Sequence, residues 1–237
     1  RNTAIGSRSM YANTTGLSNT AVGNTALREG KTGSYNTAVG TGALYFTNAS
    51  ANTATGSLAL YSNTTGAYNS AYGTNSLYRI VGTGNSAFGY NSGINSISGN
   101  YNSIFGYNAM ATYSGSNNTA IGTNTVVTAD GITNSTMLGN EAVATASDQV
   151  RIGNSLVTSI GGQVDWTTLS DGRFKKDIQD NVPGLSFIKK LKPVTYHKDV
   201  QGIQKYLKQP NTEQATGAAK EDHAKILYTG FVAQEVE

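Results

Sequence analysis

Short apolar segments recur along the first two thirds of the chain at a nearly constant spacing. Each segment follows an asparagine and ends in a glycine, as in Asn19-Thr-Ala-Val-Gly23, and successive asparagines stand 16 or 17 residues apart. The segments are too short for helices, and their alternation of polar and apolar positions between Asn and Gly is typical of short strands. A fixed period of this length indicates stacked structural repeats. The copies begin at Asn2, Asn19, Asn36, Asn52, Asn69, Asn85, Asn102 and Asn118, and a degenerate copy begins at Asn134.

Each repeat also contains a second short segment that ends in a bulky apolar residue. Examples are Thr25-Ala-Leu27 and Leu58-Ala-Leu60. We expect these segments to form a second strand, so that every turn holds two strands. Turn-rich linkers such as Ser62-Asn-Thr-Thr-Gly66 separate one repeat from the next. The pattern therefore predicts an all-β, parallel β-roll or solenoid over residues 1–160.

The side chains of the repeat suggest how such turns would stack. Alanine at the middle of each strand lets two sheets approach closely, whereas the bulkier Val, Ile or Phe row needs a second surface to cover it. A narrow roll has little interior, so we expect that surface to come from another chain. Glycine supplies positive φ angles at the corners. The repeated asparagines are expected to form a ladder in which side-chain amides hydrogen-bond to the next turn.

The repeated form Asn-Thr-Ala-x-Gly-x-x-Ala-Leu resembles the head of YadA-like trimeric adhesins over about residues 2–139. This resemblance implies a left-handed parallel β-roll in which three chains pack side by side. It also implies a homotrimer as the assembled state.

Composition separates the chain into two parts. Before residue 147 there are five basic and three acidic residues, whereas twelve basic and eleven acidic residues follow. We expect fibre repeats over 1–160, a linker over 161–169 and a separate domain over 170–237. The near balance of charge in that last part argues against nucleic-acid binding. The chain begins without Met and is expected to be a piece of a longer polypeptide.

Several kinds of chemistry are excluded by residues that the sequence lacks. The chain has no Cys, so disulfides and cysteine-based zinc sites or nucleophiles are ruled out. No apolar run is long enough to span a bilayer, so we expect no membrane insertion. The repeats contain no phosphate-binding loop and no metal-ligand spacing, so neither a cofactor nor a metal is predicted. Only Glu29, Asp130 and Glu141 provide acids before residue 147, too few to favour a polysaccharide hydrolase with paired carboxylates.

The last part of the chain carries three separated motifs. They are Ser170-Asp-Gly-Arg-Phe-Lys175, Leu191-Lys-Pro-Val-Thr-Tyr196 and Gly230-Phe-Val-Ala-Gln-Glu-Val236. In this order they resemble the C-terminal intramolecular chaperone domain of phage tailspikes and tail fibres, the endosialidase type. The resemblance implies a small α+β domain that trimerises the preceding fibre and then cuts itself off by a Ser/Lys mechanism. The family continues into a long C-terminal helix, so we expect the domain to be incomplete here.

The chemistry of such a cut can be assigned to individual residues. Ser170 is the candidate nucleophile, because a hydroxyl beside a base can attack the preceding Leu169-Ser170 peptide bond. Lys175 is the candidate general base, provided that burial or cationic neighbours lower its pKa. Arg173 and Asp171 are expected to orient the reacting groups. Any activity would be a single turnover. The alternative interpretation is that Ser170 and Asp171 cap a helix and that the lysines form a solvated face.

Local patterns predict a few further elements in this domain. Leu185–Leu191 fits a short helix that Pro193 ends, and Val194–Tyr196 and Phe231–Ala233 fit short strands. Gln201–Lys225 is polar and is expected to be a loop.

Two functions are consistent with these features. The first is a structural trimeric fibre, outside the cell, on a phage, on a phage-like particle or on a bacterial surface. The alternative is a cell-surface adhesin or receptor-binding head that recognises a glycan or a protein. The weak candidates for ligand contact are Tyr11, Tyr45, Tyr61 and Tyr78, which follow the second segments, and a second row, Tyr35, Tyr68 and Tyr101, precedes the first ones. The other interpretation of these tyrosines is a stacked ladder that covers strand ends or a chain interface.

Overall fold

The computed structural model describes residues 1–96, 98–112, 114–161, 173, 175–177, 184, 188–206 and 225–232. It divides the chain into two units, the first of which is Arg1–Asn154, while the second begins at Ser155. The predicted linker 161–169 lies outside the described residues except for Gly161, so the domain boundary at residue 170 stays a prediction.

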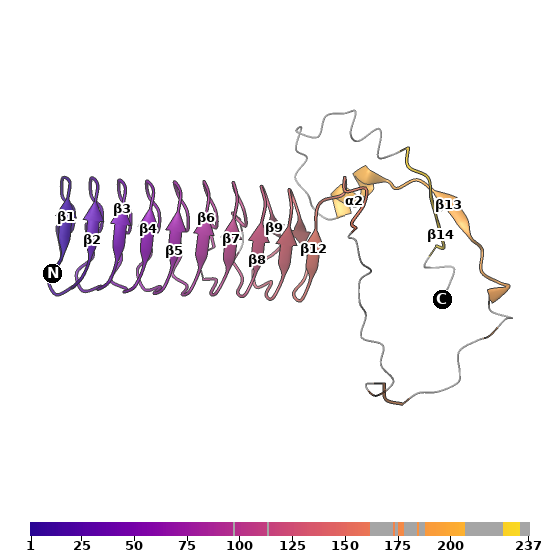
Figure 1. The fold of residues 1–237 in the computed structure, drawn as a ribbon, viewed down its shortest axis with the longest axis horizontal. Helices are drawn as coiled ribbons and strands as arrows, with labels where there is room; N and C mark the ends of the chain where they lie inside the picture. The colour runs from indigo at the N-terminus through magenta and orange to yellow at the C-terminus, as the bar shows by residue number, and fades with distance from the viewer. Residues whose placement is uncertain are drawn as a thin grey trace. The chain divides into compact units, whose positions relative to one another are not determined.

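The first unit is a parallel solenoid whose turns follow one another along a single axis (Figure 1). One strand from each turn joins a ten-stranded sheet, in the order β1-β2-β3-β4-β5-β6-β7-β8-β10-β12. All pairs are parallel and in register, so that Ala21 lies beside Ala38, for example. The strands are β1 (Thr3–Ile5), β2 (Thr20–Val22), β3 (Thr37–Val39), β4 (Thr53–Thr55), β5 (Ser70–Tyr72), β6 (Ser86–Phe88), β7 (Ser103–Phe105), β8 (Thr119–Ile121), β10 (Thr136–Leu138) and β12 (Val150–Ile152). The predicted all-β parallel solenoid is confirmed.

The prediction of two strands per turn is wrong for most turns. A second sheet forms only where β9 (Val126–Val127) pairs with β11 (Val143–Ala144). In the other turns the second segment alternates residues with left-handed backbone, as at Thr25 and Leu27, both with φ of 54°. A strand needs extended φ throughout, so this alternation coils the segment instead. Its backbone still bonds to the next turn, because the Leu27 N–H donates to the Ala43 carbonyl at 2.9 Å.

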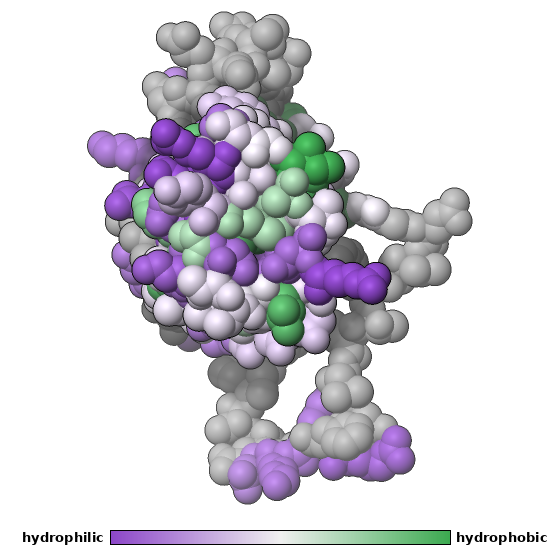
Figure 2. All heavy atoms as spheres, turned by 90° about the vertical axis from the view of Figure 1, so that its left-hand side faces the viewer, coloured by the Kyte–Doolittle hydropathy of each residue, from purple (hydrophilic) through white to green (hydrophobic). Residues whose placement is uncertain are grey.

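The core is a narrow column between the sheet and this coiled segment. The middle residue of each strand, such as Ala21, and the bulky residue of the coiled segment, such as Leu27, are both fully buried. Burying a leucine contributes roughly 1.5 to 3 kcal/mol, which exceeds the roughly 1 to 2 kcal/mol that a left-handed leucine costs. Figure 2 looks onto the N-terminal end of the solenoid, where weakly apolar residues form a band across the middle of the face.

Buried asparagines link each turn to itself and to the next turn. The Asn69 Nδ2 donates to the Gly82 carbonyl, 13 residues later in the same turn, at 2.8 Å. The Asn69 Oδ1 accepts the backbone N–H of Asn85, which begins the next turn, at 2.9 Å. The backbone N–H is accepted in the same way along the whole series from Asn19 to Ser135, at 2.8 to 3.0 Å. The predicted ladder is confirmed, but its main partner is the backbone. Within the ladder of the described turns, one side-chain amide bonds to another only where Asn85 donates to Asn69 and where Asn102 donates to Asn85.

Glycine is required where the turns approach most closely. A Cβ added at Gly82 would lie 1.9 Å from the carbonyl oxygen of Gly99 in the next turn. Gly82 is also the residue whose carbonyl accepts the Asn69 amide. Close stacking and closure of the turn therefore depend on the same position.

The second unit contains an antiparallel pair, β13 (Val194–Tyr196) with β14 (Tyr228–Gly230). The predicted strand Val194–Tyr196 is confirmed, whereas the strand predicted at Phe231–Ala233 is displaced toward the N-terminus. Tyr196 sits opposite Tyr228 in this register, and the two rings stack at 5.7 Å. The pairing then ends at Gly230, so Phe231 and Val232 lie beyond the strand, and Ala233 is outside the described residues.

A helix, α2 (Val200–Tyr206), forms where the sequence analysis predicts a loop. Asp199 caps it, because its Oδ1 accepts the Gly202 N–H at 2.9 Å. Of the helix predicted at Leu185–Leu191, the structure describes only its second half, where the Ile188 N–H donates to the Gly184 carbonyl at 3.3 Å. Leu185 and Phe187 lie outside the described residues, so the full helix stays a prediction. No helix in the described part of the chain has the length and apolar character that a membrane span needs.

Replacing one buried asparagine should destabilise the solenoid. Asn69→Ala removes the acceptor for the Asn85 N–H and the donor to the Gly82 carbonyl, and leaves both backbone groups buried without partners. We expect a loss of about 3 kcal/mol in the free energy of unfolding, measured by denaturant titration. The control is Asn24→Ala, at an exposed asparagine of the turn that begins at Asn19, with a change within about 0.5 kcal/mol. Equal effects of the two substitutions would contradict the ladder's role.

Candidate functional site

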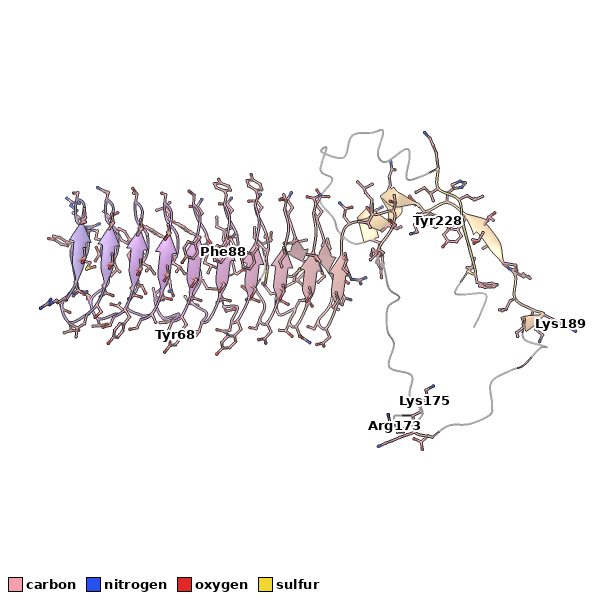
Figure 3. All side chains as sticks on the ribbon, viewed as in Figure 1. Tyr68, Phe88, Arg173, Lys175, Lys189 and Tyr228 are labelled. Carbon is pink, nitrogen blue, oxygen red and sulfur yellow. The ribbon has the colours of Figure 1, made fainter. Side chains whose placement is uncertain are left out.

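The residues assigned to self-cleavage are only partly described. Leu169, Ser170 and Asp171 lie outside the described residues, whereas Arg173 and Lys175 are described and exposed (Figure 3). The pairing of Ser170 with Lys175 therefore stays a prediction. A lysine acts as a base near neutral pH only when its pKa is lowered, by desolvation or by a positive neighbour.

The tyrosines first considered for ligand contact form a stacked column along one corner of the solenoid. The column has one member per turn, namely Tyr11, Arg28, Tyr45, Tyr61 and Tyr78. Tyr61 and Tyr78 stack at 5.1 Å with an interplanar angle of 2°, and Tyr45 lies 4.9 Å from Tyr61. The Arg28 guanidinium lies 5.5 Å from the Tyr45 ring and 6.0 Å from the Tyr11 ring, so the arginine continues the column. Because neighbouring turns cover both faces of the Tyr45 and Tyr61 rings, a ligand would meet mainly the edges of these two rings, whereas Tyr11 in the first turn is 72% exposed.

The stacked environment changes the acidity of Tyr61. Burial raises the pKa of the Tyr61 phenol above its usual value of 10.0, and the neighbouring Tyr45 and Tyr78 raise it further. Arg28 opposes this shift, because its positive charge favours the phenolate and lowers the pKa of Tyr61.

A second tyrosine row differs from this column in spacing and exposure. Tyr35, Tyr68 and Tyr101 occupy the corner position just before the buried asparagine, but only in every second turn. Their exposed fractions are 69%, 70% and 64%. Figure 3 shows Tyr68 at the lower edge of the solenoid, pointing away from it. Among the described residues, none of the three stacks on another ring.

The outer face of the ten-stranded sheet carries an almost continuous apolar row. The row is formed by the third residue of each strand, and Thr55 is its one polar member. Its stacked centre consists of Tyr72, Phe88 and Phe105, with ring centroids 4.6 Å and 4.8 Å apart. Beside it runs a row of hydroxyls, Thr or Ser, at the first strand position. Neither row contains a charged residue from β1 to β10. The apolar members are Ile5, Val22, Val39, Tyr72, Phe88, Phe105, Ile121, Leu138 and Ile152.

A shallow polar pocket lies near the C-terminal end of the repeats. It has a volume of about 420 Å³ and is lined by Ser98, Ser114, Gly115, Ser116, Asp130, Gly131 and Thr133. The Asp130 carboxylate accepts the Ser114 N–H at 2.6 Å, which fixes its position at the wall. No cluster of three metal-ligating side chains occurs in the described part of the chain.

Comparison with known families supports the interpretation of the last third of the chain. Residues 170–237 match the family model described as chaperone of endosialidase. No curated protein and no solved structure matches the chain. The family match begins at Ser170, the predicted nucleophile, and the solenoid is known here only from its own sequence and structure.

The Tyr61 environment predicts a specific pH dependence of stability. Because the folded state raises the pKa of Tyr61, this phenol keeps its proton more readily when folded than when unfolded. Its contribution to stability is complete below the unfolded pKa, near 10, and is lost as the pH rises through the higher folded value. We expect the free energy of unfolding to fall above about pH 10 in the unsubstituted chain and less steeply in Tyr61→Phe. Identical slopes in the two proteins would contradict this assignment.

Proposed function

We propose that the chain is a structural component of a homotrimeric fibre whose C-terminal domain drives trimerisation and then cuts itself off at Leu169-Ser170. The observation that best supports it is the apolar row of the sheet, joined in one chain to a match with the endosialidase chaperone family. The proposed location is outside the cell, on a phage, on a phage-like particle or on a bacterial surface.

The apolar row gives a physical reason for assembly. Phe88 and Phe105 each expose more than a third of their surface, although they belong to the most regular sheet of the molecule. Burying this exposed part of the side chain in an interface contributes about 1 to 2 kcal/mol to assembly for each large side chain. Nine apolar members spread over ten strands make a seam that runs the length of the solenoid. An exposed apolar seam of this kind is typical of an interaction surface.

Copies of the same chain fit this seam better than an unrelated partner. The row repeats with the spacing of the strands, so a second copy in register meets it side chain by side chain along its whole length. Charged residues are absent from both outward rows of β1 to β10, so in-register copies bring no like charges together. A chaperone domain at the C-terminal end would set the register before the seams close.

The proposed cleavage needs only residues of the chain and water. Lys175 accepts the Ser170 hydroxyl proton as Oγ attacks the Leu169 carbonyl carbon. The bond from that carbon to the Ser170 nitrogen then breaks, and the nitrogen takes the proton back from Lys175. Water hydrolyses the resulting ester, which releases a C-terminal fragment that starts at Ser170. Arg173 and Asp171 orient these groups in the assembled domain.

The cleavage proposal is tested by the mass of the assembled protein. We expect a fragment with Ser170 at its N-terminus from the unsubstituted chain, and a single intact chain from Ser170→Ala and from Lys175→Ala. Lys176→Ala is the matched control, since it removes a neighbouring charge, and it should still be cut. An intact Leu169-Ser170 bond in a fully formed trimer would overturn the cleavage proposal and leave the assembly proposal standing.

The assembly proposal is tested at the seam. Phe88→Asp would place three carboxylates in the covered seam, where each uncompensated charge costs several kcal/mol. We expect the trimer to be lost at micromolar concentration, as measured by native mass spectrometry or light scattering. The control Tyr90→Asp, at an exposed tyrosine beyond the end of β6, should remain trimeric. A stable monomer of the unsubstituted chain would contradict the proposal.

A further inference from the structure

We infer that the corner formed by Tyr35, Tyr68 and Tyr101 binds an extended β-1,4-linked polysaccharide. The inference rests on the proposed function in one respect: in a trimer whose sheet seams are covered, this corner faces outward. It assigns the ligand contact to a different row from the column of Tyr11, Tyr45, Tyr61 and Tyr78.

The spacing of the three tyrosines is set by the solenoid. They are 33 residues apart, which is two turns, and all have left-handed backbone, with φ of 61°, 59° and 55°. The turns between them have Ala51 and Gly84 at the same position. With about 4.8 Å per turn, the rings repeat at roughly 10 Å along a straight line.

The small residues between the tyrosines, Ala51 and Gly84, leave room for the rings of the row. A Cβ added at Gly84 would lie 2.6 Å from Cδ1 of Tyr101, so the Tyr101 ring covers the corner of the preceding turn. The Tyr101 ring therefore occupies the width of two turns. The rings lie apart from one another and stay about two thirds exposed, whereas Tyr61 and Tyr78 are stacked face to face.

This geometry suits a ligand with apolar faces at the same interval. The C–H face of a sugar ring is weakly positive and packs on the negative face of an aromatic ring. In a β-1,4-linked chain each sugar is flipped relative to the last, so the same face recurs at every second sugar. An extended chain of this kind has the same period as the tyrosine row, whereas an α-1,4-linked chain coils and does not.

Polar groups for the sugar hydroxyls lie at the end of the row. The pocket lined by Ser98, Ser114 and Asp130 belongs to the turns at and beyond Tyr101, on the same linker side of the solenoid. Its position next to the row is fixed by the Asn100 N–H, which donates to the pocket residue Ser116 at 3.1 Å. Aromatic platforms combined with a few oriented hydroxyl and carboxylate groups are typical of sites that bind neutral, hydroxyl-rich ligands.

The test measures binding of defined hexasaccharides to the full chain by calorimetry or by nuclear magnetic resonance titration. We expect cellohexaose or chitohexaose to bind and maltohexaose, the α-linked control, not to bind. Binding of only one of the first two would identify which substituent the pocket accepts. Absence of binding by both, or equal binding of maltohexaose, would overturn the inference.

Variants then separate the tyrosine row from the rest of the surface. Tyr68→Ala removes the central platform and should weaken binding about tenfold. Ala51→Tyr should also abolish most binding, because a ring is wider than one turn and three adjacent rings fit only when stacked. The control is Tyr90→Ala with Tyr107→Ala, a pair of exposed tyrosines outside the row, which should bind as the unsubstituted chain does.

The oligomeric state of each variant distinguishes this inference from the proposed function. Unchanged trimers that no longer bind sugar would support both. If Tyr68→Ala dissociates the trimer, the row is a contact between chains and the glycan inference is overturned. If the unsubstituted chain is monomeric yet binds cellohexaose or chitohexaose, the fibre proposal fails and the glycan site stands.

Discussion

The buried asparagine at the start of each turn is the interaction on which the rest of the solenoid depends. At Asn69, Nδ2 donates to the Gly82 carbonyl of the same turn and Oδ1 accepts the Asn85 N–H of the next turn, whereas the Nδ2 of Asn52 donates to the Ser50 carbonyl instead. A short-chain amide has a donor and an acceptor at the right separation for both bonds. Since these side chains are buried, a shift between neighbouring turns would leave buried donors and acceptors without hydrogen bonds, which costs free energy. The register of each turn on the next is therefore strongly specified.

The closed turns determine which side chains lie on the surface of the solenoid. The interior takes up the middle residue of each strand of the ten-stranded sheet from β2 to β10, which is alanine except for Ile104 and Met137, and the first and third residues of the strand point outward. Identical positions in successive turns then form straight rows. Whether a row is apolar, polar or aromatic depends on the residue type at that one position of the repeat. The same principle yields a charge-free apolar seam, a self-stacked column around Tyr61 and an open row around Tyr68. The three rows differ in spacing and exposure.

Much of this architecture could be predicted from the sequence, because the period of the repeat gives the length of one turn and the position of the strand within it. The strand triplets, their parallel order and the asparagine ladder all follow from a period of 16 or 17 residues. The coiled second segment could not be predicted in this way, since the left-handed residues Thr25 and Leu27 are types that ordinarily avoid positive φ. The helix α2 was missed because its composition is polar, and the cap Asp199 was its only local signal.

The cleavage site could not be predicted to the same depth. The proposed reaction depends on the distance and orientation between the Ser170 hydroxyl and the Lys175 amine, and the spacing of the two residues along the sequence does not determine these.

In the proposed trimer, the seam on the ten-stranded sheet lies between chains and the tyrosine corner lies outside. The chain has no cysteine, so a single nitroxide label can be attached at a chosen site. Electron–electron distances between equivalent labels should be measured for Thr37→Cys, on the outer face of β3, and for Thr32→Cys, on the exposed linker of the preceding turn. We expect a clearly shorter distance between chains for the Thr37 site. A shorter distance for the Thr32 site would place the linker corner at the centre of the assembly and exclude the sheet seam as the interface.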